Sequence, residues 1–185
     1  FMWRHSPQTA LMMALLPTIG ELQAVHATFW FPLTKDVDVR LDRARGGGSL
    51  LDVGCYCVSA LRLLTGTDPD QVQGTQVLGR GGVDENFAGL MQFGDVLGTF
   101  HCGFRGDHRS IVAIGSEGEL RAPDPWHSTH ACVYVNGKER QADAVDPYVR
   151  IRVPIDSVTE AWAWHATRTH STWRPIDAWL DQPER

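Results

Sequence analysis

The chain has 185 residues, of which 43% are hydrophobic and 21% charged, and its formal net charge at pH 7 is −5. This composition is typical of a globular protein with one domain, or one domain and a short appendage. The acidic balance argues against a basic nucleic-acid surface, and no uninterrupted apolar stretch approaches the roughly 18 residues of a membrane span. Neither a nucleic acid nor a membrane is therefore expected as a partner.

The N-terminal segment "SPQTALMMALLP" predicts a short helix over about residues 7–16. Ser6 is a favourable N-cap, Pro7 suits the first turn, and Pro17 ends the run. A signal peptide would need a basic start and a small-residue cleavage site, which this segment lacks. Because the chain begins with Phe1 rather than methionine, we expect it to be a piece of a longer protein.

The segment "ELQAVHATFWFPL", residues 21–33, has apolar groups on both faces, which predicts a covered strand. A charged, glycine-ended loop follows. In "SLLDVGCYCVSALRLLTG" the apolar residues recur at helical spacing, and Gly66 and Pro69 end the predicted helix. From residue 71 onward, six short strand patterns alternate with turn signals. We therefore predict an α+β fold, a large and mostly antiparallel open sheet with helices on one face.

The four cysteines, Cys55, Cys57, Cys102 and Cys132, do not suggest a disulfide framework. Cys55 and Cys57 stand two residues apart in a helical pattern, so their side chains point to nearly opposite sides of the helix. A chain of this length also needs no disulfides to stabilise its core. We therefore expect reduced thiols and a cytoplasmic location.

The stretch "GGGSLLDVGCYC" could be a phosphate loop, a metal site or a catalytic helix with bare backbone at its entrance. A dinucleotide site needs its glycines between a buried strand and a helix, whereas a charged loop precedes Gly46. A C-x-C pair on a helix cannot easily chelate one ion, and neither Cys55 and Cys57 nor His127 and His130 have a second ligand pair. We therefore expect no metal site and no cofactor-binding residues in this chain.

Asp52 and Tyr56 stand four residues apart, so on a helix they share one face about one turn apart. The apolar stripe that includes Val53 and Cys57 lies mostly on the other side. Two side chains capable of proton chemistry thus project away from the packed stripe, behind glycines that allow another group to approach closely. A surface aspartate and a half-buried structural tyrosine would fit the same pattern, and these residues alone leave both interpretations open.

With its flanking segments, this stretch closely resembles the C-terminal domain of the Gfo/Idh/MocA oxidoreductases, in the branch of glucose–fructose oxidoreductase, xylose dehydrogenase and dihydrodiol dehydrogenase. The supporting pieces run in the expected order from Phe1 to about Pro125: "FMWRHSPQ", "IGELQAV", "VRLD", "GGGSLLDVGCY", "TDPDQVQG", "GVDENFAGLMQF" and "IVAIGSEGEL". The resemblance implies a two-domain enzyme. Its Rossmann domain, absent from this chain, would bind NADP or NAD and supply a catalytic lysine, so this chain alone is expected to be inactive.

The resemblance also implies roles for individual residues. Tyr56 is the candidate proton donor or acceptor at a substrate hydroxyl or carbonyl, and Asp52 would orient the same oxygen. This suits hydride transfer, because a hydroxyl must lose its proton as its carbon loses hydride. Arg4, His5 and Arg40 match positions near the substrate cleft.

The function implied is the substrate-binding and catalytic half of an NAD(P)-dependent oxidoreductase acting on a sugar, polyol or related compound. The open sheet face would form a homodimer or a higher homo-oligomer. The expected organisation is a substrate and oligomerisation domain over residues 1–146, then a divergent tail of the same domain over residues 147–185. In that tail Pro154 and Pro175 would interrupt the expected helix. An alternative is a non-enzymatic sheet module that binds a ligand or assembles subunits and has lost its nucleotide-binding domain.

Overall fold

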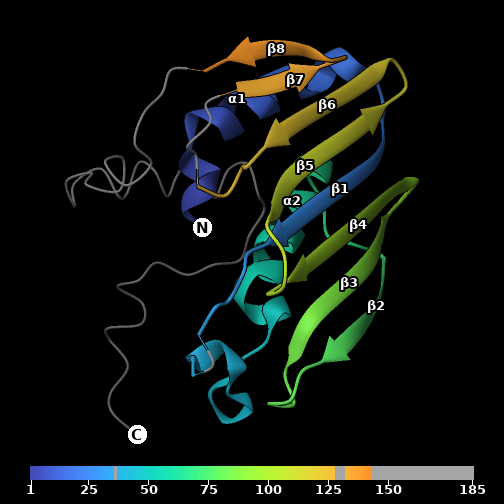
Figure 1. Ribbon diagram of the computed structural model, residues 1–185. Coiled ribbons are helices and arrows are strands. Elements are labelled where there is room, and N and C mark those ends of the chain that lie inside the picture. Colours follow the sequence, from blue (N-terminus) through green and yellow to red (C-terminus); the bar gives the residue numbers. More distant parts are fainter. Residues whose placement is uncertain (36, 128–131, 143–185) are drawn as a thin grey trace, which may run out of the picture. The chain divides into compact units, whose positions relative to one another are not determined.

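The computed structural model describes residues 1–35, 37–127 and 132–142, which are drawn in colour in Figure 1. They all belong to the first of two compact units, Phe1–Ile151, and Arg152–Arg185 makes up the second. The boundary predicted at residue 146 and the predicted tail therefore lie outside the described residues.

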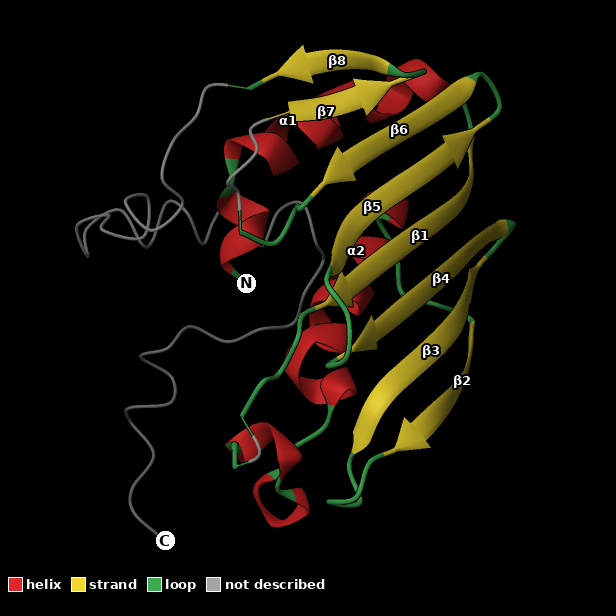
Figure 2. Cartoon of the chain, viewed as in Figure 1, coloured by secondary structure: helices red, strands yellow, loops and turns green. Residues whose placement is uncertain are grey.

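Two α-helices lie on one side of an eight-stranded sheet (Figure 2). The helices are α1, Pro7–Leu15, and α2, Cys55–Thr65. The strands are β1, Leu22–Trp30; β2, Gln71–Leu78; β3, Asp84–Phe93; β4, Val96–Gly103; β5, His108–Gly115; β6, Gly118–Pro123; β7, Cys132–Val135; and β8, Lys138–Gln141. This arrangement confirms the predicted α+β fold.

Strand β1 runs through the middle of the sheet, whose strand order is β2-β3-β4-β1-β5-β6-β7-β8. It pairs in parallel with β4, and every other neighbouring pair is antiparallel. Strand β8 has no counterpart among the predicted strands, because its sequence "KERQ" is polar throughout and fully exposed. The turn before it does follow the sequence rule, since Asn136 and Gly137 have φ values of 50° and 74°, as Asn-Gly hairpin turns require.

The ends of both helices follow the sequence signals. The Ser6 hydroxyl accepts the backbone N–H of Thr9, and α1 ends at Leu15, just before the proline-containing turn. Helix α2 ends at Thr65, and Gly66 follows with a φ of 73°. A left-handed residue at this position is common at helix ends, and glycine adopts it without steric cost.

The core lies between the helices and the sheet. Cys57 and Leu61 on α2 are fully buried, and Val53 just before the helix is nearly so. Gly54 permits this close packing, because a Cβ atom there would lie 2.8 Å from Cys102 Sγ on β4. A larger residue would push the start of the helix away from the sheet.

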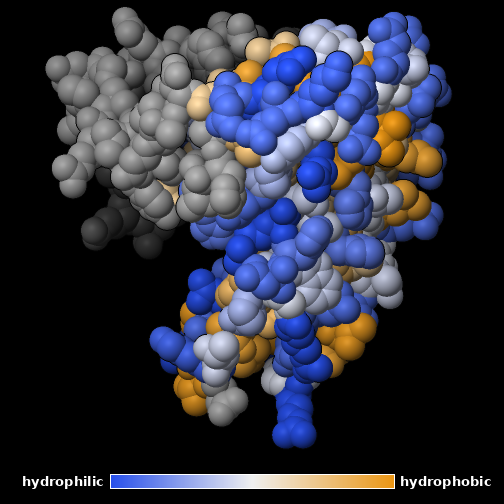
Figure 3. Space-filling model, turned by 45° about the horizontal axis from the view of Figure 1, so that its top comes forward, coloured by the Kyte–Doolittle hydropathy of each residue, from blue (hydrophilic) through white to orange (hydrophobic). Residues whose placement is uncertain are grey.

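The other face of the sheet is open. The register of strands β1 to β5 places on it every second residue from Ala24 to Trp30, Gln71 to Val77, Asn86 to Gln92, Leu97 to Gly103 and His108 to Ile114. None of these positions carries Asp, Glu, Lys or Arg, although 21% of the chain is charged. Figure 3 shows apolar patches among the polar side chains of the surface. This part of the open face is thus depleted of formal charge.

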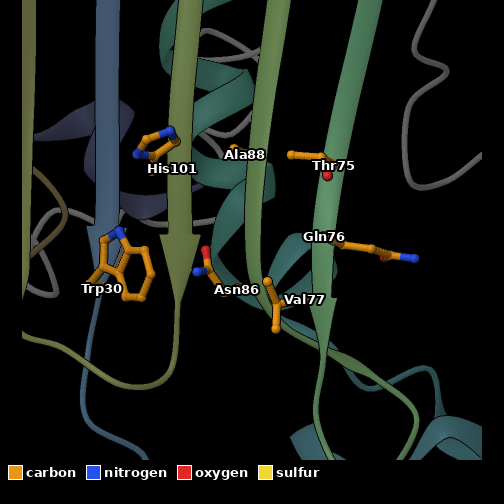
Figure 4. A pocket seen from close by; sticks show the side chains of 7 residues that line it. All are labelled: Trp30, Thr75, Gln76, Val77, Asn86, Ala88 and His101. Carbon is orange, nitrogen blue, oxygen red and sulfur yellow. The ribbon is translucent and has the colours of Figure 1, made fainter.

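A shallow hollow of about 200 Å³ lies on the open face, as Figure 4 shows. Trp30 on β1 and His101 on β4 border it on one side, and Thr75 on β2 borders it on the other. The helices that carry the predicted catalytic residues pack against the opposite face. The hollow is therefore not part of the predicted active site.

One helical run, Arg43–Thr65, is long and apolar enough to cross a membrane, with a mean hydropathy of 1.2, and half of its most apolar window is buried inside the protein. Charged residues and glycines interrupt the run, so it does not stand out in the sequence as an uninterrupted apolar stretch. The run is not one continuous α-helix, since it contains a 3₁₀ turn, Arg43–Arg45, and a π-helical turn, Leu50–Gly54, before α2. Helix α2 packs against β1 and β4, as a core helix does.

Candidate active site

The glycine run ahead of α2 uses its backbone N–H groups within the protein. Gly47 donates to the Asp42 carbonyl and Gly48 to the Arg40 carbonyl, both at 2.9 Å. The backbone N–H of Leu50 donates to Asp84 Oδ2 at 2.7 Å. A phosphate loop needs such groups to point at its ligand. These three groups are engaged with the chain itself and do not form a pyrophosphate cradle.

Sterics explain why two of these positions carry glycine. A Cβ atom on Gly47 would lie 2.5 Å from the Arg40 carbonyl oxygen. A Cβ atom on Gly48 would lie 2.1 Å from Asp84 Oδ1, and the φ of Gly48 is +121°, which side-chain-bearing residues rarely adopt. The predicted close approach behind the glycines is therefore real, and the approaching groups are Arg40 and Asp84.

The helix after the glycines begins differently from the regular α-helix that the spacing predicts. Leu50–Gly54 form a π-helical turn, in which the Cys55 N–H bonds to the Leu50 carbonyl. Such turns are rare and often lie at functional sites. Asp52 lies within the turn and Tyr56 lies in the first turn of α2, so both side chains come from the entrance of one helical run.

Arg40 contacts Asp52 directly. Its Nε donates to Asp52 Oδ2 at 2.8 Å, and its Nη1 donates to Asp38 Oδ1 at 3.3 Å. The guanidinium carbon lies 5.7 Å from the ring centre of Phe31, within the range of a cation–π contact. The structure thus brings together Asp52 and Arg40, two of the predicted site residues.

These contacts also shift protonation equilibria. The hydrogen bond to Asp52 is the largest cause that raises the pKa of the Arg40 guanidinium, with the charges of both carboxylates adding to it. The backbone N–H of Arg40 lowers the pKa of Asp38, and the Arg40 charge adds to this effect. Both groups are therefore held in their charged forms.

Tyr56 lies among aromatic side chains. Its ring makes edge contacts with Phe1, Phe29 and Trp126, at centroid distances of 4.8, 5.5 and 6.2 Å. Phe29 and Trp126 are buried and stacked on each other, with an angle of 9° between their planes. The Trp126 indole N–H donates to the Thr28 carbonyl at 2.8 Å, which anchors the stack to β1. The ring of Tyr56 is thus supported from several sides.

The other two predicted residues come from the chain's N-terminal segment. The Arg4 guanidinium donates to the hydroxyl and the carbonyl of Ser59 on α2, each at 2.8 Å. Burial lowers the pKa of Arg4, and the charge of Arg62 lowers it further. His5 is exposed. Arg4 therefore ties this segment to the helix of Tyr56, and its predicted contact with substrate stays a prediction, as does that of His5.

The sequence did not predict three residues as members of the site: Asp38, Phe29 and Trp126. For Asp38 a signal existed, since an aspartate two residues before Arg40 can accept the Arg40 N–H in a tight turn, as it does here at 3.0 Å. Phe29 lies 27 positions before Tyr56 and Trp126 lies 70 positions after it, so no local spacing rule links them. Only the folded chain brings them to Tyr56.

Cys57 and Cys102, near this site, are buried thiols, whereas Cys55 is half-buried. All four cysteines of the chain are free. Burial raises the pKa of Cys102 to about 12 and raises that of Cys57 well above its ordinary value. Thiols held in the protonated form are poor nucleophiles and poor metal ligands. Within the described ranges no cluster of three or more His, Cys, Asp or Glu side chains could hold a metal ion.

Comparison with protein families matches the model of the GFO/IDH/MocA C-terminal domain to residues 17–121. A D-xylose 1-dehydrogenase (NADP(+)) 2 from Haloferax volcanii is 40% identical over 96 residues, which cover 50% of this chain and 29% of that protein. A trans-1,2-dihydrobenzene-1,2-diol dehydrogenase from Xenopus tropicalis is 32% identical over 151 residues, which cover 77% of this chain and 44% of that protein. The chain thus spans less than half the length of these relatives.

Among solved structures, the aldose-aldose oxidoreductase from Caulobacter crescentus, complexed with glycerol, matches with a TM-score of 0.78. The match covers 89% of this chain and 52% of that chain, with 19% sequence identity. At this identity the likeness shows a shared fold and says nothing about a shared substrate.

Proposed function

Because the chain belongs to the GFO/IDH/MocA family and matches the C-terminal domain of that family, we propose that it is the catalytic half of an NAD(P)-dependent oxidoreductase. The full protein would transfer hydride between a nicotinamide and a sugar, a polyol or a related hydroxyl or carbonyl compound. The observation that carries the proposal is the placement of two side chains, Asp52 and Tyr56, at the entrance of one helical run. Asp52 is held there by Arg40, and Tyr56 is held by aromatic rings.

Each of these side chains has a task in such a reaction. The nicotinamide accepts or donates the hydride. When a hydroxyl-bearing carbon loses hydride, its oxygen becomes a carbonyl and must release a proton, and Tyr56 takes that proton. In the reverse direction Tyr56 returns it. Asp52 accepts a hydrogen bond from a hydroxyl of the substrate and so orients the substrate. A phenol with an ordinary pKa of about 10 needs a nearby cation for this work, and in the family a lysine of the Rossmann domain fills that role.

The cofactor in this proposal is NADP or NAD, bound mainly by a preceding Rossmann domain. The name of the xylose dehydrogenase relative specifies NADP(+), which supports NADP as the first cofactor to test. The glycine run of this chain contributes no phosphate cradle, because the N–H groups of Gly46, Gly47 and Gly48 donate to the carbonyls of Arg43, Asp42 and Arg40. The chain by itself should therefore bind neither nucleotide with micromolar affinity in titration calorimetry.

We also propose that the chain self-associates through the open sheet face and that the enzyme is cytoplasmic. Strands β1 to β5 offer on the order of 700 Å² at their usual spacing, close to the roughly 800 Å² per partner that stable complexes bury. These five strands carry no Asp, Glu, Lys or Arg on this face, and the cores of interfaces are likewise depleted of charge. Leu90 and Leu97 are 41% and 49% exposed on it. We propose a second copy of the chain as the partner.

The test uses the full protein that contains this domain. It should reduce NADP⁺ or NAD⁺ with at least one member of a panel of aldoses, polyols and cyclic diols, beginning with D-xylose and trans-1,2-dihydrobenzene-1,2-diol. The reaction is followed at the nicotinamide absorbance. If well-folded full-length protein reduces neither nucleotide with any member of the panel, the proposal fails and the non-enzymatic sheet module becomes the better explanation.

A further inference from the structure

Arg40 holds two carboxylates at once, and this points to a role other than substrate binding. Its Nε donates to Asp52 and its Nη1 donates to Asp38. We propose that Arg40 is a positioning residue, which holds the Asp52 carboxylate in the orientation that it needs for the substrate hydroxyl. This inference rests on the proposed function, because it assigns Arg40 to the same site.

The backbone of Arg40 is constrained on both sides of the residue. Its N–H donates to Asp38 Oδ1 at 3.0 Å, and its carbonyl accepts the Gly48 N–H at 2.9 Å. Gly47 lets the chain pass so closely that any larger residue would strike the Arg40 carbonyl. Backbone contacts of the glycine run thus hold the Arg40 loop against the helix entrance, in addition to any side-chain contact.

The side chain then completes the connection to Asp52. A guanidinium is planar and presents its donors in a rigid fork, so it can bridge two carboxylates in one plane, whereas a lysine ammonium cannot. The ring of Phe31 lies against the guanidinium, which limits its freedom to turn. Asp52 Oδ2 is thereby held, and Asp52 Oδ1 accepts no hydrogen bond from the described residues. That oxygen retains its capacity to accept one from a substrate.

The charges agree with a neutral substrate group. One guanidinium and two carboxylates carry a net charge of −1, which disfavours a phosphate or carboxylate next to Asp52 and suits a hydroxyl. The ion pair itself contributes little to folding, because the Arg40 side chain is 40% exposed and that of Asp52 is 26% exposed. Loss of Arg40 should therefore change catalysis much more than stability.

The test is a double-mutant cycle in the full-length enzyme, with the best substrate of the panel above. Arg40→Met should lower kcat about 10- to 100-fold, the effect of a misplaced catalytic group, with KM within about threefold. Arg40→Lys should restore only a small part, because a lysine ammonium lacks the planar fork of donors that meets both carboxylates. Since Arg40 acts through Asp52, the double variant Arg40→Met, Asp52→Asn should be no slower than Asp52→Asn alone.

A matched control separates this effect from general changes in the loop. Arg45 belongs to the same loop, but its partner is Asp42 rather than Asp52, with the Arg45 Nε 3.2 Å from Asp42 Oδ2. Arg45→Met should leave kcat and KM within about twofold of wild type, and the melting temperatures of both single variants should match wild type. A raised KM with unchanged kcat in Arg40→Met, or a double variant slowed by the product of the two single effects, overturns the positioning role.

A structural measurement decides the matter even if the full protein shows no dehydrogenase activity, in which case the proposed function fails on its own. Crystal structures of this chain and of its Arg40→Met variant report the orientation of Asp52. The positioning role requires that the Asp52 carboxylate moves or adopts several orientations in the variant. An unmoved, well-ordered carboxylate overturns it.

Discussion

Asp84, at the start of β3, accepts the backbone N–H of Leu50 at 2.7 Å, and the same carboxylate oxygen accepts the Ser49 hydroxyl at 2.8 Å. Donors at the start of a helix have no partner within it and need a cap. Here the cap comes from a residue 34 positions away, so a strand of the sheet holds the entrance of the helical run that carries Asp52 and Tyr56. The position of the candidate site thus depends on the sheet.

Gly48→Ala should test how closely Asp84 must approach. The added methyl group would meet the Asp84 carboxylate at a residue whose φ is already +121°, so we expect a loss of about 1–3 kcal/mol in the free energy of unfolding. Urea denaturation measures it. Gly94→Ala is the control, because Gly94 also has a positive φ, of 60°, but has open space around it. Equal losses in both variants would show that backbone strain alone demands glycine at position 48.

Tyr56→Phe should separate a catalytic tyrosine from a structural one. Phenylalanine keeps the ring and its contacts with Phe29 and Trp126, so the free energy of unfolding should change by no more than about 1 kcal/mol, the net worth of one hydrogen bond. In the full-length protein, turnover should fall by about two to four orders of magnitude, the usual contribution of general acid–base catalysis. Single-turnover hydride transfer, followed at the nicotinamide absorbance, is the measurement. A wild-type rate in this variant would return Tyr56 to a structural role.

Charges on the open face should prevent self-association. The double variant Leu90→Glu, Leu97→Glu places carboxylates on β3 and β4, where burial against a second copy would be costly. Sedimentation at high micromolar concentration should show an oligomer for the wild type and a monomer for the variant. Val72→Glu provides the control, since Val72 is exposed but its register places it on the other face of the sheet. A wild-type chain that sediments as a monomer would contradict the proposal.

The histidines of the open face should make stability depend on pH. Burial lowers the pKa of His26, and the nearby charges of His101 and His108 lower it further. The other charged groups on this face are Glu119 and Arg121, on the neighbouring strand β6. In the unfolded chain the pKa of a histidine is about 6.5. The unfolded state therefore binds more protons just below that pH, and the free energy of unfolding should fall as the pH drops from 7 toward 5.

His26→Gln should flatten this dependence, because glutamine keeps a polar partner for the Thr99 hydroxyl, which lies 2.8 Å from the His26 Nδ1, and does not titrate. Urea midpoints at several pH values, in samples dilute enough to stay monomeric, measure the difference from wild type. His101→Gln should flatten the dependence in part, since it removes one of the repelling charges. A pH profile unchanged in His26→Gln would show that its depressed pKa does not contribute.

Local sequence patterns determined much of this protein. The caps and prolines predicted where α1 begins and ends, and Gly66 marked the end of α2. Apolar groups on both faces predicted β1, and strand patterns separated by turn signals predicted every other strand except the wholly polar β8. The glycine run and the spacing of Asp52 and Tyr56 led to the family. These patterns were readable because they act between residues within about four positions of each other, where backbone geometry alone sets the contact.

The tertiary structure decided the contacts that give the candidate site its chemistry. Arg40 reaches Asp52 over 12 positions and Asp84 reaches Leu50 over 34, while Phe29 and Trp126 come to Tyr56 from separate strands and loops. The structure also placed β1 between β4 and β5 and turned the start of the predicted helix into a π-helical turn. No periodicity encodes such pairs, because their distance depends on how the sheet and the helices pack as a whole.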